Sequence, residues 1–155
     1  DTIHDANDAI QYMLDPKMDF EPGSRFEYTN GVSHLLSYII TEATGMSALE
    51  FAEEHLFEPL GITGAVWSAD TQGHNWGYSG LRITPHDMAK FGYLFLHDGE
   101  WDGEQVVPRG WVEEATSEQI DAGTLLDGYG YQWWASDDGY YSAIGLQVAV
   151  HPPGA

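Results

Sequence analysis

The sequence predicts an α+β fold, in which a mostly helical region is followed by a few antiparallel strands near the C-terminus. Through about residue 120, apolar residues recur at three- and four-residue spacing between helix start and stop signals. The pattern then changes to short aromatic and β-branched runs, which is typical of strands. We expect a single partial domain over residues 1–155, with a helical region at 1–120 and a strand region at 121–155.

Two helices are expected in the first 45 residues. Residues 2–14 carry apolar side chains at helical spacing, and Asp15 followed by Pro ends that helix. A second helix begins near Asn30, a residue type that favours the N-cap position, and ends at Gly45. Its predicted apolar positions are Val32, Leu35, Leu36, Ile39 and Ile40.

Three further helices are predicted by their N-terminal signals. Ser47 and Glu50 have the spacing of a capping box. Thr84 followed by Pro supplies an N-cap and a first-turn proline, and Pro108 starts the last helix. These helices should end near Phe57, before Gly99 and near Ser117, and residues 62–82 should be rich in loops.

A strand pair is expected at the end of the chain. Its two candidate strands are the runs at residues 129–134 and 140–150, which are rich in aromatic or β-branched residues. Between them stands Asp-Asp-Gly, a sequence that favours a tight turn. The predicted pair marks the return of the chain to a sheet.

The charge of the chain excludes several classes of partner. There are 25 Asp and Glu against 5 Lys and Arg, so the net charge is −20 and phosphate backbones or anionic lipids would be repelled. Apolar runs are too short to span a membrane, and no signal peptide is visible. Such an acid excess favours a high-salt environment, with an ordinary acidic protein as the alternative. The compartment and the oligomeric state stay open.

No metal or cofactor site is predicted. Cysteine is absent, and the seven histidines form no pair at i, i+4 spacing. Asp98, Glu100, Asp102 and Gly103 mimic the start of a calcium loop, but Arg109 occupies the position that needs a bidentate Glu. A glycine hairpin is therefore the preferred interpretation of that segment.

The order of several motifs carries a family resemblance. Pro-Gly-x-x-Phe-x-Tyr-x-Asn, ending at Asn30, precedes an apolar helix that ends in Thr-Gly. Phe-Glu-Pro-Leu-Gly, Gly-Leu-Arg-Ile-Thr-Pro-His-Asp-Met-Ala-Lys-Phe-Gly, His-Asp-Gly-Glu-Trp-Asp-Gly and Tyr-Gly-Tyr-Gln-Trp-Trp follow. From about Phe20 to Val150 the chain resembles the β-lactamase-related serine hydrolases, which include class C β-lactamases, penicillin-binding proteins, D-peptidases, esterases and 6-aminohexanoate-dimer hydrolases.

The resemblance implies a mechanism and a larger α/β fold of which this chain is part. Family members acylate the Ser of a Ser-x-x-Lys motif, while Lys and the Tyr of Tyr-x-Asn move protons. Tyr28 and Asn30 match that Tyr and Asn, and Gly145 is the candidate for the third motif, where the chain is irregular. Trp76, Tyr78 and Trp134 could line the pocket, although aromatic side chains more often pack in a core.

Ser-x-x-Lys does not occur in these residues, so the resemblance implies that this chain alone is inactive. The expected substrate of the whole enzyme is a small molecule or short peptide with an amide or ester bond. A β-lactam, a D-peptide, an oligoamide and a simple ester all remain open. A non-catalytic relative used for binding or assembly is the alternative function. A carboxylate-rich cation binder is a third possibility.

Overall fold

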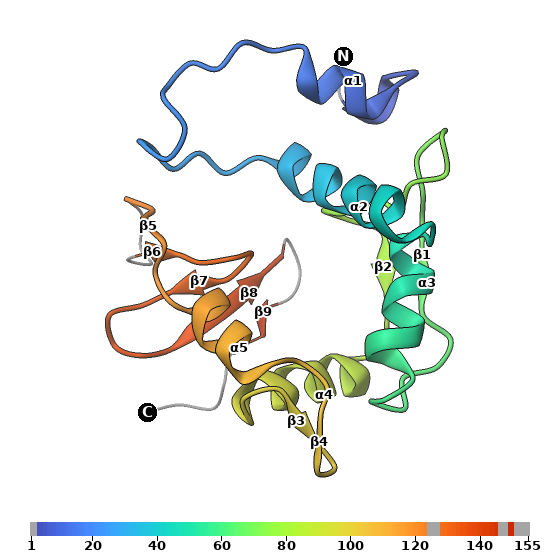
Figure 1. Ribbon diagram of the computed structural model, residues 1–155, viewed down its shortest axis with the longest axis vertical. Coiled ribbons are helices and arrows are strands. Elements are labelled where there is room, and N and C mark those ends of the chain that lie inside the picture. The colour runs from blue at the N-terminus through green and yellow to red at the C-terminus, as the bar shows by residue number, and fades with distance from the viewer. Residues whose placement is uncertain (1–2, 124–127, 146–148, 151–155) are drawn as a thin grey trace. The chain divides into compact units, whose positions relative to one another are not determined.

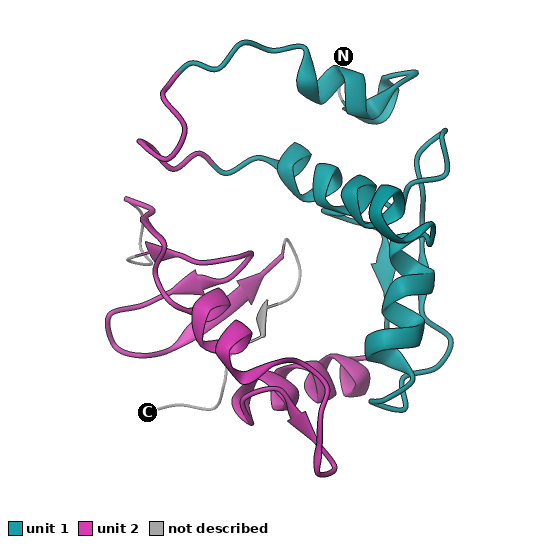
Figure 2. Ribbon diagram, viewed as in Figure 1, with its two compact units in different colours: residues 1–19, 28–83 teal, residues 20–27, 84–155 magenta. Residues whose placement is uncertain are grey.

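In the computed structural model, residues 3–123, 128–145 and 149–150 are described (Figure 1). They form a mixed α and β structure with small antiparallel sheets. The chain divides into two compact units (Figure 2). The first contains residues 1–19 and 28–83, and the second contains residues 20–27 and 84–155.

The first unit is mostly helical. A 3₁₀ turn η1 and four further elements precede a short two-stranded sheet, in which β1 and β2 are antiparallel. The elements are η1 (Ile3–Asp5), α1 (Ala9–Leu14), α2 (Asn30–Thr44), α3 (Ala48–Ala52), the π-helical η2 (Glu53–Phe57), β1 (Val66–Trp67) and β2 (Leu81–Arg82).

Helix ends in this unit largely follow their local signals. Ser47 and Glu50 form the predicted capping box, with Ser47 N–H donating to the Glu50 carboxylate at 2.8 Å. Gly45 ends α2 in the left-handed conformation, with φ of 75°. The continuous helix expected at 2–14 is wrong, because the Asp8 side chain caps a new start by accepting from Gln11 N–H at 2.8 Å.

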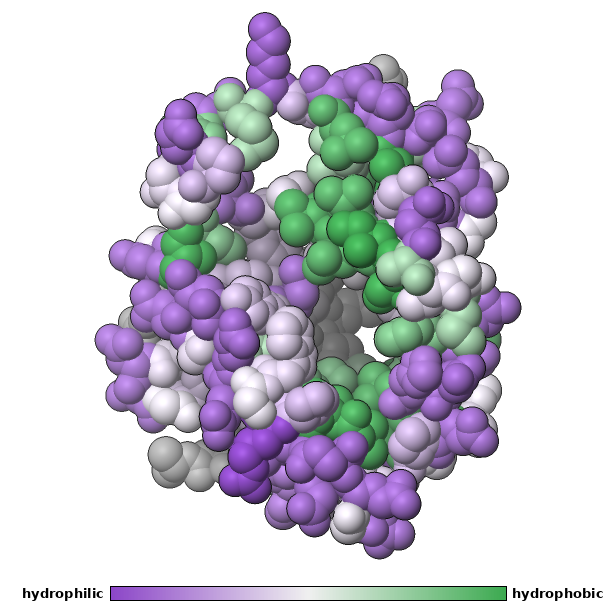
Figure 3. Space-filling view, viewed as in Figure 1, coloured by the Kyte–Doolittle hydropathy of each residue, from purple (hydrophilic) through white to green (hydrophobic). Residues whose placement is uncertain are grey.

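The predicted apolar face of α2 does not form a buried face. Val32, Leu36 and Ile39 are exposed, and His34 and Ser37 are buried instead. Hydrophobic side chains accordingly gather at the surface over α2 in Figure 3. The spacing located a real apolar stripe, but the side of the helix that packs within the unit is the polar one.

The second unit joins two helices to a β-meander. Helices α4 and α5 flank the β3–β4 hairpin, and a five-stranded antiparallel sheet follows in the order β5-β6-β7-β8-β9. The elements are α4 (Pro85–Leu96), β3 (Glu100–Trp101), β4 (Glu104–Gln105), α5 (Arg109–Thr116), β5 (Ile120–Asp121), β6 (Gly128–Tyr129), β7 (Trp134–Ala135), β8 (Tyr141–Ile144) and β9 (Ala149–Val150).

An aromatic and aliphatic cluster forms the core of this unit. Phe95 of α4, Val112 of α5 and Trp133 are each at most 6% exposed, and Phe91 packs against them. The Phe95 and Trp133 rings lie 4.6 Å apart between centroids. Burial of these large side chains therefore attaches α4 and α5 to the meander.

The strand region contains more and shorter strands than the single pair that the sequence predicted. The run at residues 129–134 contributes to two strands, because the chain reverses at Gln132, which has φ of 67°. The Asp-Asp-Gly turn joins β7 to β8, as predicted, and Gly139 adopts φ of 84°. The expected pair is thus corrected to a meander of short strands.

Candidate active site

The Tyr-x-Asn segment enters α2 through an extended residue. Thr29 has φ −139° and ψ 133°, and its hydroxyl accepts from Gly31 N–H at 3.3 Å. The expectation that Asn30 caps the helix is therefore wrong, since Asn30 is its first helical residue. Capping by the preceding Thr leaves the Asn30 carboxamide out of the capping contact.

Tyr28 and Asn30 line the same surface depression, of about 390 Å³. The opposite wall comes from Ile3, Tyr12 and Met13, so α1 and the start of α2 form the depression together. The Met13 side chain lies directly over Gly31, where any side chain would collide with it. Tyr28 is 56% exposed. Both candidate catalytic residues therefore line one depression that is open to solvent.

The first turn of α2 also carries a favourable field for negative charge. Unpaired N–H groups at the start of a helix give that end a partial positive charge. Residues 28–31 lie at this end of the 15-residue helix α2. Negative charge that develops on a substrate or on a nearby oxygen would be stabilised there.

A buried hydrogen bond between His34 and Asp70 fixes α2 one turn beyond Asn30. His34 and Asp70 have side chains that are 0% and 1% exposed, and His34 Nε2 lies 3.2 Å from Asp70 Oδ2. An ionised carboxylate only accepts hydrogen bonds, so Nε2 carries the proton in this pair. Nδ1 of His34 has no hydrogen-bond partner among the described residues. This contact ties α2 to the loop that follows β1.

Asp70 is held as a carboxylate by several donors. Burial alone would raise its pKa, but the backbone N–H groups of His74 and Gln72, each 2.9 Å from Oδ1, and His34 lower the pKa overall. Nδ1 of His74 lies 3.4 Å from Oδ2. The loop is thus organised around one buried negative charge.

Trp76 and Tyr78 lie elsewhere in the first unit. Trp76 is 8% exposed, and its ring lies between those of His34 and His4, with centroids 4.6 and 4.3 Å away. The Tyr78 hydroxyl is 2.9 Å from His4 Nε2, and burial raises the Tyr78 pKa. Neither is among the described residues that line the depression. Both pack beside the His34–Asp70 pair instead.

Two predicted residues belong to the second unit. Gly145 directly follows β8 and is exposed. The residues after it, 146–148, which complete the expected third motif, lie outside the described residues. Trp134 in β7 packs edge-on against Tyr129 at 4.9 Å.

The segment that resembles a calcium loop, at residues 98–103, is part of a β-hairpin, as predicted from the sequence. Glu100 pairs with Gln105 across β3 and β4, and the Arg109 guanidinium lies 3.1 Å from the Asp98 carboxylate. Within residues 3–123, 128–145 and 149–150, no three His, Asp or Glu side chains are grouped to hold a metal ion. Over the same ranges, no helix has the length and apolarity that crossing a bilayer requires.

The chain has a β-lactamase-like fold, and solved structures with this fold superpose on it. A Bacillus anthracis protein assigned as a 6-aminohexanoate-dimer hydrolase superposes with a TM-score of 0.74 at 31% identity. The match covers 86% of this chain and 36% of that one. A penicillin-binding protein from Bacillus halodurans gives 0.67 at 19% identity, over 86% and 49% of the two chains.

The family model described as Beta-lactamase matches residues 1–154, so the chain belongs to the β-lactamase family of hydrolases. It is also 27% identical over 154 residues to the 6-aminohexanoate-dimer hydrolase of Paenarthrobacter ureafaciens. That match covers 92% of this chain and 39% of the relative. The chain therefore spans about two fifths of the length of this curated relative.

Proposed function

We propose that this chain is the Tyr-x-Asn-bearing part of a serine hydrolase that cleaves an amide or ester bond through an acyl-enzyme. The observation that carries the proposal is the shared cavity of Tyr28 and Asn30 at the positive end of α2. Membership of the β-lactamase family supports it. Because Ser-x-x-Lys does not occur in these 155 residues, the nucleophile would be supplied by another part of the enzyme.

Each residue has a defined role in this proposal. The Tyr28 hydroxyl relays a proton between the nucleophilic serine, the lysine and the leaving group, since a serine hydroxyl attacks well only when a base removes its proton. The Asn30 carboxamide holds the lysine and the substrate amide. Gly145, beside the third motif, would contribute backbone groups that hold the substrate.

The test is ester turnover by the complete hydrolase that contains this chain. Tyr28→Phe removes one hydroxyl, and we expect kcat to fall by a factor of about 10²–10⁴ with an unchanged melting temperature. Tyr93→Phe is the matched control, because Tyr93 is also exposed, at 50%, and lies in the other unit. Equal turnover in the two variants would remove Tyr28 from the mechanism.

The same measurements on the complete protein distinguish the hydrolase from the alternative, a non-catalytic relative used for binding or assembly. It expects no turnover of any ester by the complete protein and no covalent acyl adduct. The absence of Ser-x-x-Lys from these residues is the observation that favours this alternative.

A further inference from the structure

The depression at Tyr28 differs in charge from three other surface depressions of the described residues. Its described lining contains no Asp, Glu, Lys, Arg or His: the wall is Ile3, Tyr12 and Met13, and the floor is residues 28–31. Three other depressions are each lined by at least three carboxylates. Those are Glu50, Glu53, Glu54 and Glu58; Glu113, Glu118 and Asp137; and Asp98, Glu100 and Asp102.

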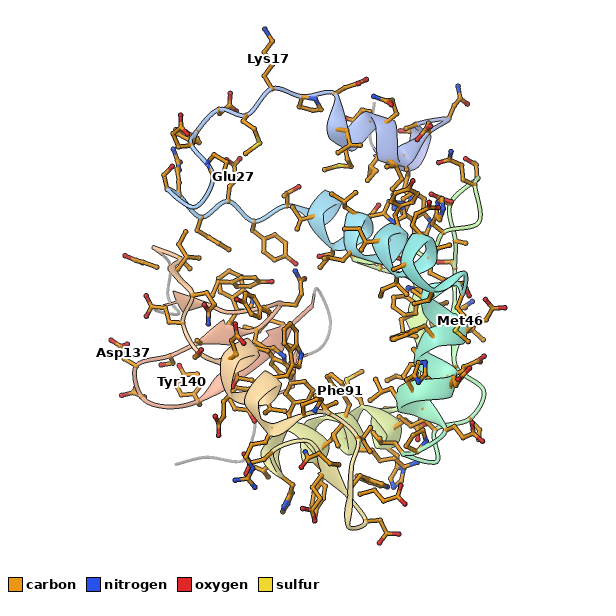
Figure 4. All side chains as sticks on the ribbon, in the orientation of Figure 1. Lys17, Glu27, Met46, Phe91, Asp137 and Tyr140 are labelled. Atoms are coloured by element: carbon orange, nitrogen blue, oxygen red, sulfur yellow. The ribbon has the colours of Figure 1, made fainter. Side chains whose placement is uncertain are left out.

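No fixed cation faces the depression from the described part of the first unit. Lys17 is the cation nearest to Met13 in sequence, yet it is exposed and points away from α1 and α2 (Figure 4). Arg82, in β2, is exposed and is not a lining residue. A substrate carboxylate bound here would meet only the partial positive charge at the start of α2, and no cationic side chain of the lining would replace its lost hydration.

The wall itself suits an apolar group. Ile3 and Met13 are half-buried, Tyr12 presents an aromatic ring that is 42% exposed, and a thioether adapts to varied shapes. The volume of about 390 Å³ exceeds that of a short alkyl chain. Burial of such a chain against these side chains is favourable by the hydrophobic effect.

We propose that the depression walled by Ile3, Tyr12 and Met13 is a specificity-determining subsite for an uncharged, apolar group next to the scissile amide or ester bond. The inference rests on the proposed function, since it names the substrate class of the same site. Met13 and Tyr12 act by selecting the substrate, and Tyr28 and Asn30 act on the bond.

The experiment compares two esters of equal acyl length with the complete hydrolase. These are p-nitrophenyl hexanoate and the p-nitrophenyl monoester of adipic acid, which differ by a terminal carboxylate. We expect kcat/KM to be at least tenfold higher for the hexanoate. Met13→Lys should change this ratio at least fivefold in favour of the adipate, because the new ammonium faces the carboxylate.

Leu14→Lys is the matched control, since Leu14 is the next residue, is 59% exposed and does not line the depression. It adds the same charge, and thus corrects for the weaker overall repulsion of anions when a chain of net charge −20 gains one positive charge. We expect its ratio to stay within twofold of the wild type. Tyr12→Lys provides the same test at an exposed wall position if Met13→Lys lowers the melting temperature.

The outcomes separate the two proposals. Hydrolysis of the hexanoate with a ratio that Met13→Lys and Tyr12→Lys leave unchanged, or that Leu14→Lys changes equally, overturns the subsite and leaves the hydrolase intact. No hydrolysis of either ester, together with no covalent labelling by a fluorophosphonate, overturns the proposed function and the subsite with it.

Discussion

The buried carboxylate of Asp70 offers the sharpest test of how the first unit holds α2. Asp70→Asn keeps the size of the side chain and one acceptor oxygen for the N–H groups of Gln72 and His74. It places an NH₂ group against His34 Nε2, which now lies 3.2 Å from a carboxylate oxygen. The His34 ring must then move its proton to Nδ1, a buried atom with no partner among the described residues.

The magnitude follows from these contacts. A hydrogen bond to a charged group contributes about 1.5–3 kcal/mol, and a buried unsatisfied donor costs about 1–3 kcal/mol. Because the new NH₂ group can donate to the deprotonated Nε2 of His34, part of this cost is recovered, and we expect a loss of about 2–3 kcal/mol in the free energy of unfolding. At about 2–4 °C per kcal/mol for a 155-residue chain, its melting temperature should fall by roughly 4–12 °C.

Thermal unfolding followed by circular dichroism at pH 7 measures this effect. Asp138→Asn is the matched control, because it removes the same charge from an exposed turn, and it should change stability by less than about 0.5 kcal/mol. Equal melting temperatures for the two variants would mean that the His34–Asp70 hydrogen bond contributes nothing to the stability of the fold.

Three further predictions concern pH, packing and salt. The pKa of Asp70 lies below its ordinary value of 3.8, so the ionised carboxylate stabilises the fold fully above that pH, and this stabilisation is lost as the pH falls further. In an acid titration, the free energy of unfolding should therefore fall more steeply for the wild type than for Asp70→Asn. Gly77→Ala should destabilise by about 1–3 kcal/mol, because its Cβ would overlap the Ser33 carbonyl of α2, whereas Gly110→Ala, which meets open space in α5, should stabilise by about 0.5–1 kcal/mol in chemical denaturation. With a net charge of −20, the melting temperature should rise from low to molar salt, and a flat response would contradict a stabilising effect of charge screening.

Local signals in the sequence predicted the helix ends well. The Ser47–Glu50 capping box and the start of α4 at Thr84 depend on residues within one turn, and both are confirmed. The buried face of α2 could not be predicted in the same way. Periodicity reveals an apolar stripe, but the partner of each face is set by distant segments, and here His34 meets Asp70, 36 residues away.

The sequence likewise indicated only some residues of the candidate site. Tyr28 and Asn30 were found from the spacing of the Tyr-x-Asn segment beside an apolar helix. No pattern in the sequence indicated that Ile3 and Met13 lie opposite them, because this depends on the packing of α1 against α2. Gly31 is the one retrospective signal, since Met13 approaches α2 where a side chain is missing.

The most direct measurement is intact mass of the complete hydrolase after reaction with a fluorophosphonate, followed by peptide mapping. We expect one covalent adduct on a serine outside these 155 residues, and labelling about 10²–10⁴-fold slower in Tyr28→Phe than in Tyr93→Phe. An adduct within this chain, or equal labelling rates in the two variants, would contradict the assignment of Tyr28 to an acyl-enzyme mechanism.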